Sequence, residues 1–102
     1  MKYLLVLQLP ASSIKDYDKM IRFEESVIEA LGEFGDVDGH DAGSGEMNMF
    51  ILTDEPELAF ERIKTLDGVR PLMPKLKVAY RENGKSDFTI IHPLGLTHFA
   101  IA

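Results

Sequence analysis

The sequence predicts a single α+β domain in which two helices lie on one face of an antiparallel sheet. Three observations support this prediction. The chain has 102 residues, the length of one ordinary domain spanning residues 1–102. Hydrophobic residues make up 45% and charged residues 27% of the chain, so there is enough apolar surface to build a core. Segments of strand and helix character follow one another in the order β-α-β-β-α-β, with one further strand at the end.

The first strand is expected over residues 2–9, a nearly continuous apolar run. A run that is apolar on both faces is typical of a central strand covered on both sides. The first helix is expected over residues 14–31, with Ser13 as its N-cap and Gly32 as its C-terminal stop. Its apolar stripe has helical spacing and comprises Ile14, Tyr17, Ile21, Ile28 and Leu31, widened by Met20, Phe23 and Val27.

Residues 36–42 and 47–53 are expected to pair as a hairpin around Gly43-Ser44-Gly45. A second helix is expected to start at residues 54–57, where Thr53 or Asp54 is the expected cap and a proline falls in the first turn, and to end at Asp67-Gly68. The buried face of this helix is expected to comprise Leu58, Ala59, Ile63 and Leu66.

The last two strands are expected over residues 75–82 and 85–92, joined by a tight turn at Asn83-Gly84 because both residues tolerate positive φ. This register places Glu82 opposite Lys85. The complete order of elements predicts a ferredoxin-like β-α-β-β-α-β sandwich with an appended C-terminal β-strand. Right-handed crossovers favour the strand order 4-1-3-2, with the fifth strand beside the fourth.

Two helices cover only one face of such a sheet, so the other face needs a cover. Alternation along the first strand directs Leu4 and Val6 to one face. The opposite face is expected to be left open by the helices and carries Tyr3, Leu5, Leu7 and Leu9. A second copy of the chain is the favoured cover, which predicts a homodimer. The alternative cover is the C-terminal tail with Leu94, Leu96, Phe99 and Ile101.

The net charge of -6 is unevenly distributed along the chain. Residues 24–61 contain twelve acidic side chains and no Lys or Arg, whereas residues 62–85 contain seven basic and two acidic ones. An acidic half repels phosphate, so nucleic acid is not an expected partner. The same charge attracts a basic protein partner. The alternative interpretation is a solvated surface that keeps the protein soluble.

The chain contains no cysteine, which excludes a disulfide scaffold, a thiolate zinc site and a cysteine nucleophile. The apolar run at the N-terminus is too short to span a bilayer, and no small-residue cleavage site follows it. We therefore expect a cytoplasmic protein that has no membrane partner.

The densest polar cluster lies on the first hairpin and comprises Asp36, Asp38, His40, Asp41 and Glu46. Strand alternation directs Asp36, Asp38 and His40 to one face, although glycine at position 39 permits a bulge that rearranges the faces. Carboxylates beside an imidazole suit a divalent metal or an acid–base pair, so His40 with Asp38 or Asp41 is the catalytic candidate. The spacing matches no known ligand motif. A charged edge strand that resists pairing with other chains is favoured, and no metal or cofactor is predicted.

Three other groups suggest chemistry. Arg81 is a binding candidate beside Tyr80, because its guanidinium suits a carboxylate or phosphate, or an acidic residue of its own chain. His92 and His98 are expected to be structural, hydrogen-bonded residues. Gly43-Ser44-Gly45 has the composition of an anion nest, but acids surround it and no Lys follows, which favours a hairpin turn.

The hairpin sequence Gly-Asp-Val-Asp-Gly-His-Asp-Ala-Gly-Ser-Gly-Glu-Met-Asn, which begins at Gly35, resembles a family of small uncharacterised bacterial proteins. Residues 79–81 and 88–93 extend the resemblance over most of the chain. It implies the ferredoxin-like fold and no established activity. Two functions stay open: a non-catalytic protein-binding module, such as an immunity-type inhibitor of a basic partner, or a small enzyme or small-molecule sensor with a pocket on the open sheet face.

Overall fold

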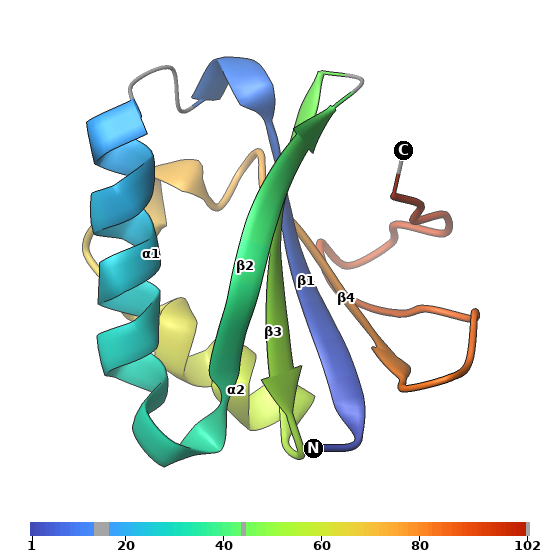
Figure 1. The fold of residues 1–102 in the computed structure, drawn as a ribbon. Coiled ribbons are helices and arrows are strands. Elements are labelled where there is room, and N and C mark those ends of the chain that lie inside the picture. Colours follow the sequence, from blue (N-terminus) through green and yellow to red (C-terminus); the bar gives the residue numbers. More distant parts are fainter. Residues whose placement is uncertain (14–16, 44, 102) are drawn as a thin grey trace.

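The computed structural model describes residues 1–13, 17–43 and 45–101, which form a five-stranded antiparallel sheet and two α-helices (Figure 1). The sheet has the order β2-β3-β1-β4-β5. This α+β arrangement is compatible with a ferredoxin-like sandwich. The strands are β1 (Tyr3–Pro10), β2 (Asp36–Gly43), β3 (Glu46–Thr53), β4 (Lys77–Glu82) and β5 (Thr89–His92). The helices are α1 (Tyr17–Leu31) and α2 (Pro56–Ile63), with 3-10 turns η1 (Ala11–Ser13), η2 (Gly32–Phe34) and η3 (Arg70–Leu72).

β1 is the central strand that its apolar sequence predicts. β3 pairs with one edge of β1 and β4 with the other, so the backbone of this strand is hydrogen-bonded on both sides. All five residues from Leu5 to Leu9 are buried. Burial of consecutive residues requires a cover on both faces of the sheet, because successive side chains point to opposite faces.

The helices cover the face of β1 that carries Leu5, Leu7 and Leu9, which we call the helix face. The main core packs there and combines β1 with Met20, Phe23, Val27 and Leu31 of α1, Met47, Met49 and Ile51 of β3, and Ala59, Phe60 and Ile63 of α2. The prediction that Tyr3, Leu5, Leu7 and Leu9 form the open face is therefore wrong. Strand alternation separates the two sets of side chains, but it does not say which set meets the helices.

α1 ends where the sequence predicts and buries part of the predicted stripe. Gly32 follows the helix with φ +52°, a conformation that glycine adopts without strain. Among the side chains of α1 that the structure describes, Met20, Phe23, Val27 and Leu31 are buried, whereas Ile28 is 51% exposed. Ile28 therefore does not belong to the core stripe. The expected helix start at residues 14–16 lies outside the described residues, so the cap assigned to Ser13 stays a prediction.

α2 begins at Pro56, but its cap and its buried face differ from the prediction. The N-cap position is Glu55, and no side chain caps it. The Thr53 hydroxyl instead accepts the N–H of Glu55 at 3.0 Å and donates to the carbonyl of Phe34. Leu58 is 41% exposed, while Phe60 is buried at 4%. The two apolar residues are two positions apart, so they lie on opposite sides of the helix.

The expected hairpin between β4 and β5 is only partly formed. The turn at residues 82–85 is present, since the Lys85 N–H donates to the Glu82 carbonyl at 3.0 Å and Gly84 has φ +83°. However, Tyr80 pairs with Thr89, so residues 85–88 leave the ladder. The predicted two-residue turn and the antiparallel pairing of the last two strands are therefore confirmed, whereas the predicted register, with Glu82 opposite Lys85 in the ladder, is wrong.

Contacts outside the ladder account for this departure. The Arg81 Nη1 donates to the carbonyl of Lys85 at 2.7 Å, which holds the loop close to β4. The ring of Phe88 packs against Phe99 with 4.9 Å between centroids. Residues 85–88 thus turn toward the C-terminal tail instead of extending the sheet.

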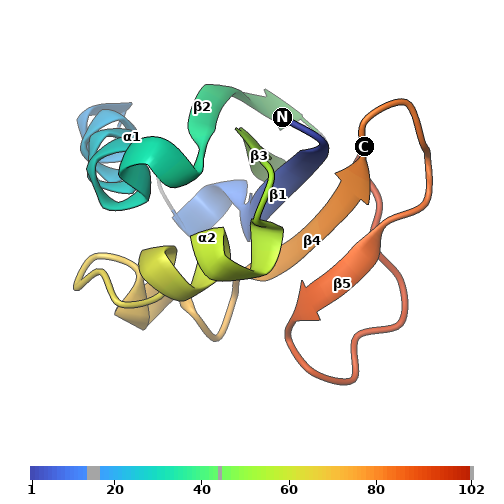
Figure 2. The same cartoon turned by 90° about the horizontal axis from the view of Figure 1, so that it is seen from below.

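The tail lies on the side of the sheet opposite the helices, which we call the open face (Figures 1 and 2). The Ala100 carbonyl accepts a hydrogen bond from the Gln8 Nε2 of β1 at 3.0 Å. Val6 and Ala79, which pair across β1 and β4 on this face, are completely buried. The tail therefore covers part of the open face, although Leu94 points away and is 97% exposed. In the described part of the chain, no helix is long and apolar enough to cross a membrane.

Candidate functional site

The acidic cluster lies on β2, an edge strand that pairs only with β3. A bulge between Val37 and Gly39 shifts the register, and Gly39 has φ +117°, which favours glycine. On one side of the bulge Asp36 pairs with Leu52, and on the other side His40 pairs with Met49. Leu52 and Met49 lie on opposite faces of β3, so Asp36 and His40 do as well. The prediction that Asp36, Asp38 and His40 share one face is therefore wrong, because the bulge at Gly39 reverses the alternation between Asp36 and His40.

His40 points to the helix face and contacts α1. Its Nδ1 is 2.7 Å from the Glu24 Oε2, and both side chains remain partly exposed, at 29% and 20%. This pair joins the edge strand to the helix in front of it. Asp41 lies on the open face, where it accepts a hydrogen bond from Asn48. The structure thus pairs His40 with Glu24 and directs Asp41 to the other face.

A row of polar side chains crosses the open face. The sequence predicts only one of its members, Asp41, as a candidate site residue. The Asn48 Nδ2 donates to the Asp41 Oδ1 at 3.1 Å, and the Gln8 Nε2 donates to the Asn48 Oδ1 at 3.0 Å. The same Gln8 nitrogen donates to the Ala100 carbonyl of the tail. Gln8 is 3% and Asn48 is 1% exposed. The available signal in the sequence was a glutamine inside the apolar run of β1, since a buried amide needs hydrogen-bond partners.

The remaining candidates lie apart from one another. Arg81 is on β4 opposite Leu4, where it donates to the Lys85 carbonyl and lies 5.8 Å from the ring of Phe88. Glu46 begins β3 opposite Pro10 and is half-buried. His92 has the structural environment expected of it: its Nε2 is 3.0 Å from the Met73 carbonyl and its ring packs beside Phe60. His98 is exposed in the tail, and Ser44 of the glycine-rich turn lies outside the described residues.

The described side chains of the candidate site do not form a metal-binding group. Among the residues that the structure describes, no group of three or more His, Asp or Glu side chains is placed to hold a metal ion. Asp36 and Asp38 are exposed at the sheet edge. Charged side chains at such an edge discourage another strand from pairing with β2.

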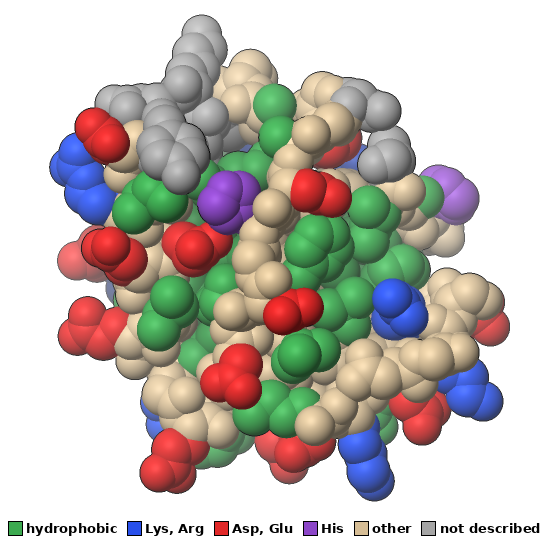
Figure 3. Space-filling view, in the orientation of Figure 1, with side chains coloured by type: hydrophobic (Ala, Val, Ile, Leu, Met, Phe, Trp, Pro, Cys, Tyr) green, Lys and Arg blue, Asp and Glu red, His purple; other side chains and the backbone are tan. Residues whose placement is uncertain are grey.

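Beside this edge lies an apolar area that the tail leaves partly uncovered. Leu4, Phe50 and Leu52 are half-buried on the open face and form what we call the open-face patch. The carboxylates of Asp36, Asp38 and Asp41 line β2 next to it and form the acidic edge. Figure 3 shows acidic side chains along β2, with apolar side chains gathered on the side away from α1. The acidic surface continues onto α1, where Glu25, Glu29 and Glu33 of the helix and the following turn are exposed.

Comparisons with protein-family models, with curated proteins and with solved structures find no match for this chain. We therefore infer a function from the chemistry of the open-face patch and the acidic edge.

Proposed function

We propose that the protein is a non-catalytic binding module of ferredoxin-like fold whose open-face patch and acidic edge bind a basic protein partner, as an immunity-type inhibitor does. The observation that carries this proposal is the position of the open-face patch directly beside the acidic edge: Leu52 pairs with Asp36 on one side and Leu4 on the other. Specific interfaces commonly combine an apolar centre with a polar rim. The open-face patch corresponds to such an apolar centre, and the acidic edge corresponds to part of such a rim.

The charge of the acidic edge favours a basic partner over a second copy of the chain. Two acidic edges brought together would place like charges opposite each other, which is destabilising. The bulge at Gly39 also interrupts the regular strand edge that sheet extension needs. A basic partner instead gains attraction from the same carboxylates, and this attraction speeds association and weakens with salt. The homodimer remains the competing outcome of the test.

The experiment uses a photo-crosslinking residue at Leu52, with a matched control at Leu58. Leu58 is an exposed apolar residue on α2, away from the proposed surface. We expect crosslinking in source-cell extract to yield a basic protein from position 52 and not from position 58. The purified partner should then bind the Asp36→Asn/Asp38→Asn variant about tenfold more weakly than the wild type. An Asp67→Asn/Glu57→Gln control, which changes two exposed acids elsewhere, should bind normally.

Two results contradict the proposal. One is a crosslinked second copy of this chain, which shows that the surface is a homodimer interface. The other is a partner whose affinity is the same in both acid variants and does not change with salt concentration, because such binding does not depend on the acidic edge.

A further inference from the structure

A cavity of about 460 Å³ lies on the helical side of the molecule, between α1 and the segment that links α2 to β4. Its volume is within the range of small-molecule sites. One wall is a stripe of α1 formed by Lys19, Arg22, Phe23 and Ser26, whose spacing places them on the same side of the helix. The other wall is formed by Leu66, Gly68, Val69, Pro71 and Leu72 of the linker.

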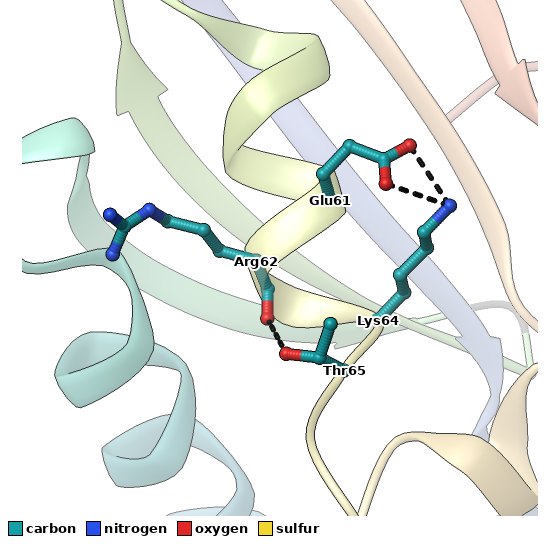
Figure 4. Close-up of polar contacts among 4 residues, drawn as sticks. All are labelled: Glu61, Arg62, Lys64 and Thr65. Atoms are coloured by element: carbon teal, nitrogen blue, oxygen red, sulfur yellow. Dashed lines mark hydrogen bonds and ion pairs between the residues drawn. The ribbon is translucent and has the colours of Figure 1, made fainter.

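The linker wall is held in place by its own hydrogen bonds. The N–H of Val69 donates to the Leu66 carbonyl at 3.0 Å, and the N–H of Leu72 donates to the Val69 carbonyl at 2.9 Å. At the start of the linker, the Thr65 hydroxyl donates to the Arg62 carbonyl at 2.8 Å and closes the last turn of α2 (Figure 4). These hydrogen bonds fix the shape of the linker wall, which reduces the entropic cost of binding.

Glu61, Arg62 and Lys64, which Figure 4 also shows, are not among the residues that line the cavity. Lys64 forms an ion pair with Glu61 at 2.9 Å. Arg62 extends toward the end of α1, where its Nη1 donates to the Ala30 carbonyl at 3.2 Å and its guanidinium lies 4.2 Å from the Phe34 ring centroid. These basic residues already have partners in the protein. Lys19 and Arg22, in contrast, form no ion pair with any residue that the structure describes.

The described part of the cavity lining has the opposite charge to the protein as a whole. Among the lining residues that the structure describes there are two cations and no carboxylate, although the chain carries a net charge of -6. Its remaining side chains are mostly apolar, with Phe23 and Val69 buried and Leu66 and Leu72 half-buried. A ligand that satisfies both features has an apolar body and one anionic group, because the body removes apolar surface from water while the anion meets the two cations.

We propose that this cavity binds a small amphiphilic carboxylate, with its apolar body against Phe23, Leu66 and Leu72 and its carboxylate toward Lys19 and Arg22. Arg22 supplies a planar guanidinium that suits a carboxylate, and Lys19 adds a second positive charge one helical turn away. The site is distinct from the open-face patch, since it lies in the helical layer. Binding of a carboxylate in this cavity therefore does not depend on the open-face patch or the acidic edge.

Octanoate is the probe, and 1-octanol is its uncharged match. Methyl NMR spectra recorded during a titration of the full chain should show saturable shifts at Leu66, Val69 and Leu72 while Val6 and Leu52 remain unchanged. A Lys19→Gln/Arg22→Gln variant should bind octanoate about fivefold or more weakly, the effect of losing two partly exposed charge contacts. Octanol should show a similarly weak affinity for the wild type. Because both residues are on the helix surface, the unperturbed spectrum of the variant serves as the check of its folding.

The matched control is Lys75→Gln/Lys85→Gln, which removes two exposed cations outside the cavity and should leave octanoate binding unchanged. Four results overturn the proposal: equal affinity in the Lys19/Arg22 and control variants, equal affinity for octanol and octanoate, shifts centred on Val6 and Leu52, or no saturation at millimolar octanoate. Failure of this test leaves the crosslinking from position 52 unaffected, so the two proposals are distinguished.

Discussion

On the helix face of the sheet, Leu7 and Ile51 belong to a continuous cluster of buried apolar side chains beneath two amphipathic helices. On the open face, Gln8 and Asn48 are buried to the same degree but lie beneath a tail without regular structure, and each uses its amide group in hydrogen bonds. The first face is stabilised by close packing and by removal of apolar surface from water. The second depends on specific polar partners, because burial of an unpaired amide is unfavourable.

This difference means that the two faces respond to different substitutions. Loss of volume should be most harmful on the helix face, where a cavity would remain. Loss of a single polar partner should be most harmful on the open face, where the remaining group would stay buried without a hydrogen bond.

The largest expected effect is that of Leu7→Ala. Leu7 is completely buried on the helix face, so the substitution should lower the free energy of unfolding by about 2–5 kcal/mol. Val6→Ala, one residue away on the open face, should cost less because fewer buried methyl groups are removed. Urea unfolding of both variants measures the comparison. A greater loss for Val6→Ala would show that the main core is not on the helix face.

The second largest loss of stability is expected for Gln8→Leu. This substitution removes the amide that donates to both the Asn48 Oδ1 and the Ala100 carbonyl. The free energy of unfolding should decrease by about 1–3 kcal/mol, because an acceptor is left buried without its donor. The double variant Gln8→Leu/Asn48→Leu should recover part of this loss, since both members of the pair are then apolar. If the loss in the double variant equals the sum of the losses in Gln8→Leu and Asn48→Leu, the hydrogen bond does not couple the two residues.

Removal of residues 94–102 tests the cover of the open face. Phe99 is half-buried and contacts Phe88, so its loss should lower the free energy of unfolding by about 1–1.5 kcal/mol. The newly exposed apolar surface around Val6 should also cause self-association that increases with concentration. Light scattering measures both chains. A full-length mass that stays near 11.5 kDa at all concentrations assigns the cover to the tail, whereas twice that mass identifies the homodimer.

The smallest effect is expected at Gly84, in the loop that leads toward the open-face cover. Gly84 has φ +83°, so Gly84→Val should cost about 1 kcal/mol because a β-branched residue resists this conformation. Gly43→Val is the control, since Gly43 also has open space around it but no positive φ. Thermal unfolding of the two variants should separate conformational strain from the bulk of the valine. Equal losses would show that the turn conformation is not responsible.

For the candidate site, the sequence identified the charged edge but not the contacts of its residues. The run of acids and the glycine at position 39 were enough to predict a charged edge strand with a permitted bulge. The hydrogen bond of His40 with Glu24 could not be predicted, because it joins residues 16 positions apart through the packing of α1 on β2. The bonds from Gln8 to Asn48 and Ala100 span 40 and 92 positions and depend on how the sheet and tail are placed.

For the fold, local sequence determined the elements and the tertiary structure decided which surfaces meet. The apolar run of β1, the stop at Gly32, the turn at residues 82–85 and the start of α2 at Pro56 all follow from conformational preferences of neighbouring residues. The exposure of Ile28, and the burial of Phe60 instead of Leu58, were decided by the position of each helix over the sheet. Periodicity separates the two sides of a strand or helix, but only contacts between distant segments determine which side is covered.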